Sequence, residues 1–572
     1  SQQSTGFCGI LQQMLAKVRS AVSGRTSTED NDNLEAVATQ PPRIGMVIDM
    51  AEANFIGGLI PVIGGPEKMR YPYSRPEFLY FSDEDIAISA DQTARPVLCP
   101  KDPSRMPVYA GYAEVINAGK TEQNEDQASA RILNLVQQGY EAEQARELDT
   151  FERNTSVLSR QSRASSEIRR RSSKTNFPRR HSDEDLITLP ERRLSVDDGP
   201  TMERAEAAFF AILDGHAGSG AAIMAANCLH EHVRARLSQV LETAIHLDRQ
   251  ETLFGGYCRS PSSHALVGVY NAQSSNRSIT CDSLVIGAME AAFVDMDEQI
   301  AEEKQLWKIP GGCAAIAALF FLGKIYVANA GDCRALLVSS NHIQQLSEDF
   351  TPETERKRLQ YLAYKNPDLV GNCFSRYEYS RFLTRRDLKK KVLYRDWYMD
   401  GWAAKTVRDS DLRPPLISDR GKKRRLLNTI GVSRGFGDHH LLTADDKIPI
   451  KPFLSPVPEV RVVDLHKLDS LSDKDVLVLA SDGLWDVLNN EDVALIVKAA
   501  LNNNETAESL KYTMAAHELA IAARGNPTES YRWQMSSGGC ASSDDITVFV
   551  ISLKYALAAP TPDDDDDVEL LQ

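Results

Sequence analysis

Four aspartates stand at the ends of strongly apolar stretches that have the character of buried β-strands: Asp126, Asp214, Asp482 and Asp544. A lone carboxylate beside a buried strand is costly to desolvate, so several that converge are expected to share a cation. Ligands that are all oxygen favour Mg²⁺ or Mn²⁺ over zinc. Each aspartate alone would more often be a turn residue or a helix cap. Together they predict a site for divalent cations.

The tripeptide Asp214-Gly215-His216 adds chemistry to one of these positions. Glycine lets a backbone carbonyl approach a metal ion, and histidine is a proton donor whose charge switches near neutral pH. A histidine beside glycine is often structural, but this one directly follows a candidate metal ligand. We therefore predict a catalytic role for His216.

The sequence around these acids predicts the elements that position them. A short apolar run ends at Asp214 and is followed by a polar turn and a long amphipathic pattern, which is typical of a strand, a site loop and a helix. Residues 476–501 repeat this order. A strand that ends in a polar loop and then resumes is predicted within residues 111–130, and residues 544–553 supply a last strand.

A β-hairpin is predicted between these segments. Its strands are expected at residues 313–322 and 325–330, with the turn at Gly323 and Lys324. The second strand leads directly into Gly331-Asp332, another acidic position at a strand end.

Composition and charge exclude several classes of protein. The 572 residues carry a formal net charge of −15, which argues against a general nucleic-acid binder because such proteins need a basic face. The nine cysteines are scattered singly, without the spacing of a zinc site, so we expect reduced thiols, as in the cytosol or nucleus. Of the two we predict a cytoplasmic protein. The sequence holds no apolar run of the ~18 to 20 residues that a membrane-spanning helix needs.

The N-terminal residues 1–24 predict an amphipathic helix, because the apolar side chains between positions 7 and 22 fall on one face. That face would lie on a membrane surface, such as the surface of the Golgi, or it would pack against protein. Both alternatives remain open. Residues 25–70 are predicted to form a linker.

Three further segments are predicted to lie outside the folded core: a disordered Ser/Arg-rich insertion at residues 136–204, a loop at residues 250–280 and an acidic tail at residues 554–572. Within the insertion, Ser172, Ser182 and Ser195 follow arginines, as basic-directed kinases require. A regulatory loop and an unmodified tether are equally compatible with this pattern.

Residues 349–428 are long, charged and aromatic. We expect an ordered subdomain here, because Tyr394, Trp397, Tyr398 and Trp402 favour burial.

Six motifs resemble those of the metal-dependent protein phosphatase family, type 2C, and occur in that family's order: the acidic pair 125–126, DGH at 214–216, GD at 331–332, SRGFGD at 433–438, SDGLWD at 481–486 and DDIT at 544–547. Segments such as RYPYSRPEFL and FTPETERKRLQYLA are similar to the animal subgroup lettered H, J and M. The resemblance implies an α+β fold over residues 71–553. That fold is an αββα sandwich of two antiparallel sheets flanked by helices, with a flap subdomain at residues 349–428 beside the cleft and disordered insertions.

The resemblance also implies a reaction, the hydrolysis of phosphoserine and phosphothreonine on proteins by water that two Mg²⁺ or Mn²⁺ ions activate. Asp214 would bridge both ions, and the Gly215 carbonyl, Asp482 and Asp544 would complete the two sites. His216 would protonate the departing serine or threonine oxygen.

Further positions take their implied roles from the same motifs. Glu125 and Asp126 would act on the ions directly or through water. Asp332 and Asp486 match positions linked to a weaker third ion. Lys120 stands where most of the family has a phosphate-binding arginine, and lysine is a single mobile charge rather than a two-pronged donor.

The resembling subgroup acts on phosphorylated Rab GTPases, which implies that class of partner. Two other functions remain as alternatives. One is a pseudophosphatase scaffold, against which the complete acidic motifs argue, and the other is a membrane-surface adaptor that binds through residues 7–22. The sequence carries no signal for the oligomeric state.

Overall fold

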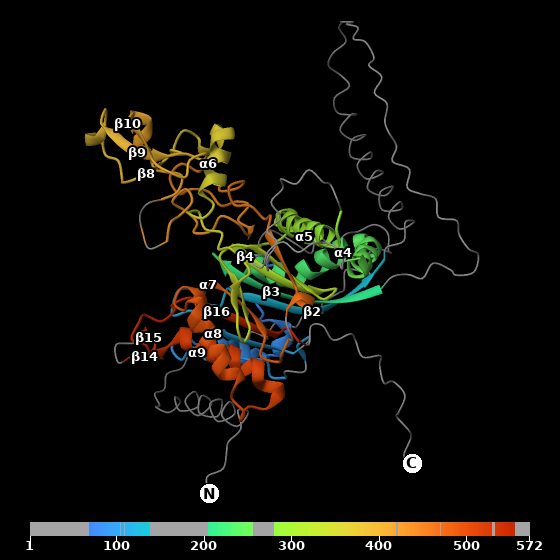
Figure 1. Cartoon of the computed structure of the whole chain (residues 1–572). Helices are drawn as coiled ribbons and strands as arrows, with labels where there is room; N and C mark the ends of the chain where they lie inside the picture. Colours follow the sequence, from blue (N-terminus) through green and yellow to red (C-terminus); the bar gives the residue numbers. More distant parts are fainter. Residues whose placement is uncertain are drawn as a thin grey trace, which may run out of the picture. The chain divides into compact units, whose positions relative to one another are not determined.

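The middle of strand β3 (Arg204–His216) is buried on both faces in the computed structural model of the chain (Figure 1). Phe209 packs into a core between this sheet and a pair of helices, and Phe210 packs into a second core between two sheets. Because side chains alternate along a strand, a strand in this position needs apolar residues in succession. Asp214 lies four residues after Phe210, so its side chain points to the same face of β3, toward the second sheet, near the end of the strand.

The structure describes residues 68–102, 105–107, 109–137, 204–254, 279–418, 421, 423–468, 471–528 and 532–554. These residues all belong to one unit of the chain, residues 63–572. The predictions that fall wholly or mostly outside the described residues are the N-terminal helix (1–24), the linker (25–70), the Ser/Arg-rich insertion (136–204) and the tail (554–572).

Two antiparallel sheets form the centre of this unit. One has the order β12-β5-β4-β3-β2, with β11 paired to β4, and the other has the order β1-β16-β13-β6-β7. The strands of the first sheet are β2 (Gln127–Val136), β3, β4 (Gly312–Phe321), β5 (Lys324–Ala330), β11 (Phe436–Gly437) and β12 (Glu459–Asp464). Those of the second are β1 (Ala110–Val115), β6 (Arg334–Val338), β7 (Ile343–Gln345), β13 (Val476–Ala480) and β16 (Ile546–Ser552).

Helices cover the outer face of each sheet. Helices α4 (Gly220–Phe254) and α5 (Cys281–Glu303) pack on the first sheet, and α8 (Asn490–Leu501) and α9 (Lys511–Arg524) pack on the second (Figure 1). Between the sheets, the ring of Phe549 lies 5.5 Å from that of Phe210. The predicted αββα sandwich is therefore confirmed.

The β4-β5 hairpin turns one residue earlier than predicted. Leu322 and Gly323 have φ values of 49° and 69°, so they are the two central residues of the turn, and Lys324 already belongs to β5. Two successive positive φ values are typical of the tight turn whose twist matches that of the flanking strands.

The predicted boundaries of two insertions also differ from the structure. The β2-β3 ladder pairs Val136 with Arg204, so both limits of the predicted insertion lie within ordered strands. Helix α4 continues to Phe254, so the predicted loop of residues 250–280 begins too early, whereas α5 begins at Cys281, directly after its predicted end. Residues 255–278 lie outside the described part of the chain.

The predicted flap is an ordered subdomain with its own small sheet, β10-β9-β8, and a helix, α6 (Arg356–Lys365). Its strands are β8 (Glu378–Tyr379), β9 (Lys391–Arg395) and β10 (Ala403–Thr406). The expectation of buried aromatic residues is wrong for Tyr398 and Trp402, which are 61% and 43% exposed. The small apolar cluster under this sheet, which includes Leu383, leaves them no interior to enter.

The remaining elements are short: η2 (Glu77–Leu79), α2 (Asp83–Ser89), η4 (Pro367–Val370), η5 (Arg385–Asp387), η6 (Asp409–Leu412), η7 (Leu465–Lys467), α7 (Asp482–Trp485), η8 (Glu508–Leu510), β14 (Asn526–Pro527) and β15 (Trp533–Gln534). Among the helices that the structure describes, none has both the length and the apolar character needed to cross a bilayer.

Candidate metal centre

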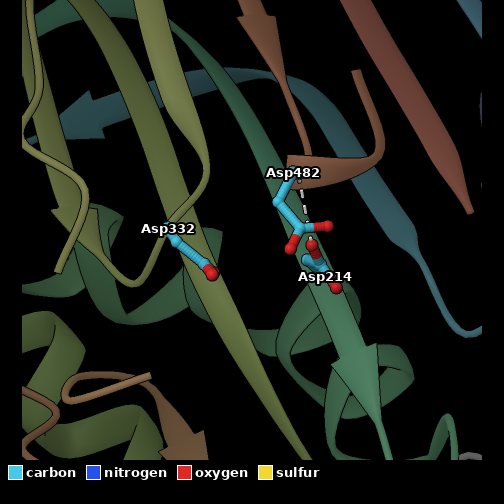
Figure 2. Close-up of side chains that lie close together, drawn as sticks. All are labelled: Asp214, Asp332 and Asp482. Carbon is cyan, nitrogen blue, oxygen red and sulfur yellow. Dashed lines mark hydrogen bonds between the residues drawn. The ribbon is translucent and has the colours of Figure 1, made fainter. Parts of the chain in front are cut away.

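Three aspartates meet where strand ends from both sheets come together. Asp214 lies near the end of β3, Asp332 lies in the turn from β5 to β6, and Asp482 begins α7 one residue after β13 ends. Each offers a carboxylate oxygen within 4.8 Å of those of the other two. Figure 2 shows the side chains converging, with the backbone amide of Asp482 donating a hydrogen bond to Asp214 at 3.4 Å. The fold thus brings together three predicted metal ligands from distant parts of the sequence.

The chemistry of these residues fits a hard divalent cation. Burial raises the pKa of Asp214 well above its ordinary value, and the carboxylates of Asp126 and Asp482 raise it further. Burial also raises the pKa of Asp332 to about 7, with Asp482 adding to the effect. A cation among these oxygens would relieve both the repulsion and the desolvation. Carboxylate oxygens without sulfur or nitrogen ligands are the donors that Mg²⁺ and Mn²⁺ prefer.

Two glycines allow backbone segments at this site to approach one another. A Cβ atom at Gly215 would lie 2.3 Å from the carbonyl oxygen of Glu125, and one at Gly483 would lie 1.8 Å from that of Asp545. Each contact is far shorter than a real Cβ atom tolerates. The glycines after Asp214 and Asp482 are therefore required for backbone packing, in addition to any use of the Gly215 carbonyl as a ligand.

The acidic pair before β2 divides into an accessible and a buried member. Glu125 lines the cleft of about 490 Å³ that contains the three aspartates, and it accepts a hydrogen bond from the Gly218 amide at 2.7 Å. Asp126 is only 1% exposed, and burial raises its pKa well above the ordinary value. Of the two predicted ligands, Glu125 is thus the one that the cleft reaches directly.

Asp544 and Lys120 lie on the same cleft and form an ion pair. The Lys120 side chain is 53% exposed and that of Asp544 is 29% exposed, so solvent and ligands reach both. The structure places the predicted phosphate-binding lysine against a predicted metal ligand.

Asp545, next in the chain, holds the loop before β2 in place. Its carboxylate accepts hydrogen bonds from the backbone amides of Asn117 at 2.7 Å and of Glu125 at 3.0 Å. Burial raises the pKa of Asp545 to about 6.

His216 is held by a partner that the sequence analysis did not assign. Its Nε2 lies 2.7 Å from a carboxylate oxygen of Asp438, which is buried. Burial lowers the pKa of His216, but the hydrogen bond and the charge of Asp438 outweigh burial and raise that pKa above its ordinary value. The signal for Asp438 was its place as the last residue of SRGFGD, a motif noted only for its order.

Lys423 is a second unassigned residue, and it comes from the segment that follows the flap sheet. Its Nζ lies 2.5 Å from Asp482 Oδ2 and 3.0 Å from Asp486 Oδ2. The only hint in the sequence was a run of basic residues shortly before SRGFGD. Asp486, predicted for a weaker third ion, is exposed and faces this ammonium group beside the three-aspartate cluster.

Comparison with known proteins gives one consistent match. The profile of the family "Protein phosphatase 2C" matches residues 179–395 and 414–529. The chain is 40% identical to protein phosphatase 1H of Homo sapiens over 537 residues, which cover 88% of this chain and 98% of that protein. It is 37% identical to protein phosphatase 1J of Mus musculus over 558 residues, which cover 94% of this chain and 98% of that protein.

A solved structure gives a weaker match. The serine-threonine phosphatase 2C of Toxoplasma gondii aligns over 60% of this chain and 84% of that chain, with 19% identity and a TM-score of 0.29.

Proposed function

Because the chain belongs to the protein phosphatase 2C family and is a metal-dependent protein serine/threonine phosphatase, we propose how its candidate centre hydrolyses phosphoserine and phosphothreonine. Asp214, Asp482, Asp544, Glu125 and the Gly215 carbonyl would hold two Mg²⁺ or Mn²⁺ ions. The observation that carries this proposal is the approach of carboxylate oxygens of Asp214, Asp332 and Asp482 to within 4.8 Å of one another. Glu125 and Asp544 line the same cleft.

Other acids would support these ligands. Asp126 would act on the ions from its buried position through water. Asp332 and Asp486 would take a weaker third ion. When bound, divalent cations of this kind acidify water toward neutral pH and offset the charge on a phosphoryl group.

His216 would supply the proton that the leaving serine or threonine oxygen needs. Its Nε2 is engaged with Asp438 at 2.7 Å, so Nδ1 is the ring nitrogen left to donate that proton. The pKa of His216 is raised, which keeps the donor protonated to higher pH. A positioned general acid typically contributes ~10² to 10⁴ in rate.

Lys120 would bind the phosphate of the substrate. Its ammonium group lies on the cleft and is paired with Asp544, and a phosphate oxygen would compete for that charge. Lysine offers a point charge without the paired, parallel hydrogen bonds of arginine, so it holds a phosphate less rigidly.

The substrate class we favour is phosphorylated Rab GTPases, on the strength of the motifs shared with the H, J and M subgroup. The flap offers a surface of suitable character, because Tyr361, Tyr398 and Trp402 are exposed there, and aromatic residues are enriched at protein interfaces. The reaction would take place in the cytoplasm or, through residues 7–22, on an internal membrane.

One assay tests the central proposal. The full chain is given a phosphothreonine peptide with Mn²⁺, then with a chelator, and phosphate release is measured. We expect release that the chelator abolishes and that Asp214→Asn lowers by at least a hundredfold. Asp83→Asn, the same change at an exposed position on α2, should match the unaltered protein.

The alternatives predict other outcomes in that assay. A pseudophosphatase scaffold would release no phosphate under any condition. A membrane-surface adaptor would bind anionic vesicles without turnover. For the substrate class, a phosphorylated Rab GTPase should be dephosphorylated with higher kcat/KM than a peptide that spans the same phosphosite. Equal values would contradict that part of the proposal.

A further inference from the structure

The Lys423 side chain forms ion pairs with the carboxylates of Asp482 and Asp486, which a divalent cation bound there would need as ligands. Its Nζ contacts one oxygen of each, at 2.5 and 3.0 Å. Asp486 follows Asp482 by four residues, and its backbone amide donates to the Asp482 carbonyl at 2.8 Å, so one helical turn presents both carboxylates on the same side. The lysine thus fits a two-carboxylate pocket that the chain itself builds.

The segment that carries Lys423 is anchored in the flap. Its neighbour Arg425 exchanges two hydrogen bonds with Ser418, from the Arg425 amide to the hydroxyl at 2.8 Å and from the Ser418 amide to the Arg425 carbonyl at 2.8 Å. Leu426 and Leu427 are fully buried in an apolar cluster that joins flap residues such as Leu359 of α6 to residues beyond the flap such as Ile450. The position of the ammonium group is therefore coupled to the position of the flap.

We infer that Lys423 is a tethered cation that competes with the weaker third ion proposed at Asp332 and Asp486, both for Asp486 and for the adjacent oxygen of Asp482, so that the flap controls occupancy of that position. This inference rests on the proposed metal-dependent function.

The physical basis is direct competition. A divalent ion bound through the same two oxygens would face the ammonium charge at contact distance, where repulsion between like charges is large. The ion must therefore displace the lysine, and the flap segment that carries Lys423 must move with it. Because linkage is reciprocal, a flap held away from the centre should raise the affinity for this ion.

The test is a Mn²⁺ titration of the full chain, followed through the electron paramagnetic resonance signal of free Mn²⁺. Lys423→Met should bind the weakest ion at least tenfold more tightly than the unaltered protein does. Adding Asp486→Asn to Lys423→Met should abolish that gain, because one of the two carboxylates is lost. Lys423→Arg keeps the charge and should gain at most a few fold.

Lys357→Met is the matched control. Lys357 is a half-exposed flap lysine on α6, paired with Asp400 at 2.6 Å, so its loss changes the net charge equally without touching the centre. This variant should bind Mn²⁺ as the unaltered protein does. Lys423→Gln repeats the measurement if circular dichroism shows that Lys423→Met is misfolded.

The outcomes separate two failures. Equal Mn²⁺ isotherms for the unaltered protein, Lys423→Met and Lys423→Gln would overturn the role of Lys423 alone. A protein that binds no Mn²⁺ in any form would overturn the two-ion proposal as well. An equal gain in Lys357→Met would show a general charge effect and would also overturn the inference.

Discussion

The sandwich core and the flap hold their aromatic side chains in different ways. In the core, Phe210 and Phe549 are fully buried and pack ring against ring. In the flap, Tyr398 is mostly exposed and Trp402 is nearly half exposed, and the guanidinium group of Arg395 lies 4.8 Å from the Trp402 ring centroid. Close packing holds the core, whereas the sheet of the flap relies heavily on charged and cation-π contacts.

This difference separates two tasks. The candidate metal ligands Asp214 and Asp482 stand at or just after the ends of strands that are buried on both faces, where packing fixes their spacing. The flap instead presents exposed rings to the outside and reaches the centre through Lys423. A closely packed centre beside an exposed aromatic surface suits an enzyme that performs one reaction on large protein substrates. Four predictions test this contrast.

The largest effect on stability is expected in the core, at the buried ion pair between Arg75 and Glu114. Arg75 donates to the two carboxylate oxygens of Glu114 at 2.8 and 2.6 Å and to the Asp126 carbonyl at 2.7 Å. Arg75→Met would leave a buried charge unpaired, so the free energy of unfolding should fall by about 3–5 kcal/mol in urea denaturation. The double variant Arg75→Met with Glu114→Gln should lose less stability than Arg75→Met alone. A double variant that loses as much as the single variant would contradict the explanation.

The next effect is expected where the flap joins the core, at Glu355. Arg434 donates a hydrogen bond to its carboxylate at 2.7 Å, and Arg358 donates one at 2.5 Å. Burial raises the pKa of Glu355, but these hydrogen bonds outweigh burial and lower it overall. Glu355→Gln should lower the free energy of unfolding at pH 7 by about 1.5–3 kcal/mol.

The pH dependence of that loss follows from the sign of the shift. A carboxylate whose pKa is lowered on folding contributes stability above its unfolded pKa, and this stability disappears as pH falls through the folded value. The difference between the two proteins should therefore be full at pH 7 and shrink below about pH 4. A difference that stays constant down to pH 3 would contradict the role of the charge.

A smaller effect is expected at Asp438, which joins β11 to the centre through His216. Asp438→Asn removes the charge that raises the pKa of His216. The protonated histidine is present below its pKa and lost as pH rises through it, so the alkaline limb of the kcat profile should move to lower pH in the variant. At pH 8, kcat should fall by about tenfold, or ~1.4 kcal/mol. An unmoved limb would remove His216 as the proton donor.

The smallest effect on stability is expected on the flap surface. Tyr398→Ala should change the free energy of unfolding by no more than about 0.5 kcal/mol, because the side chain is mostly exposed. It should raise KM for a folded phosphoprotein while leaving hydrolysis of a short phosphopeptide unchanged. Equal effects on both substrates would mean that this surface does not contact the protein substrate.

The sequence was sufficient to predict the features that local patterns encode. The positions of Asp214 and Asp482 at strand ends were predicted from apolar runs that end in an acidic residue. The turn of the β4-β5 hairpin was predicted to within one residue. The contacts of Asp438 and Lys423 could not be predicted, because their partners lie 222 and 59 positions away and meet them only in the fold. Trp402 was wrongly expected to be buried, since hydrophobicity does not reveal that a small sheet lacks an interior.

The most direct measurement is the anomalous scattering of a crystal grown in Mn²⁺. The account predicts Mn²⁺ peaks bound by Asp214 and Asp482, with Glu125, Asp544 and the Gly215 carbonyl around them. Peaks bound elsewhere, or these acids without any bound ion at saturating Mn²⁺, would contradict it.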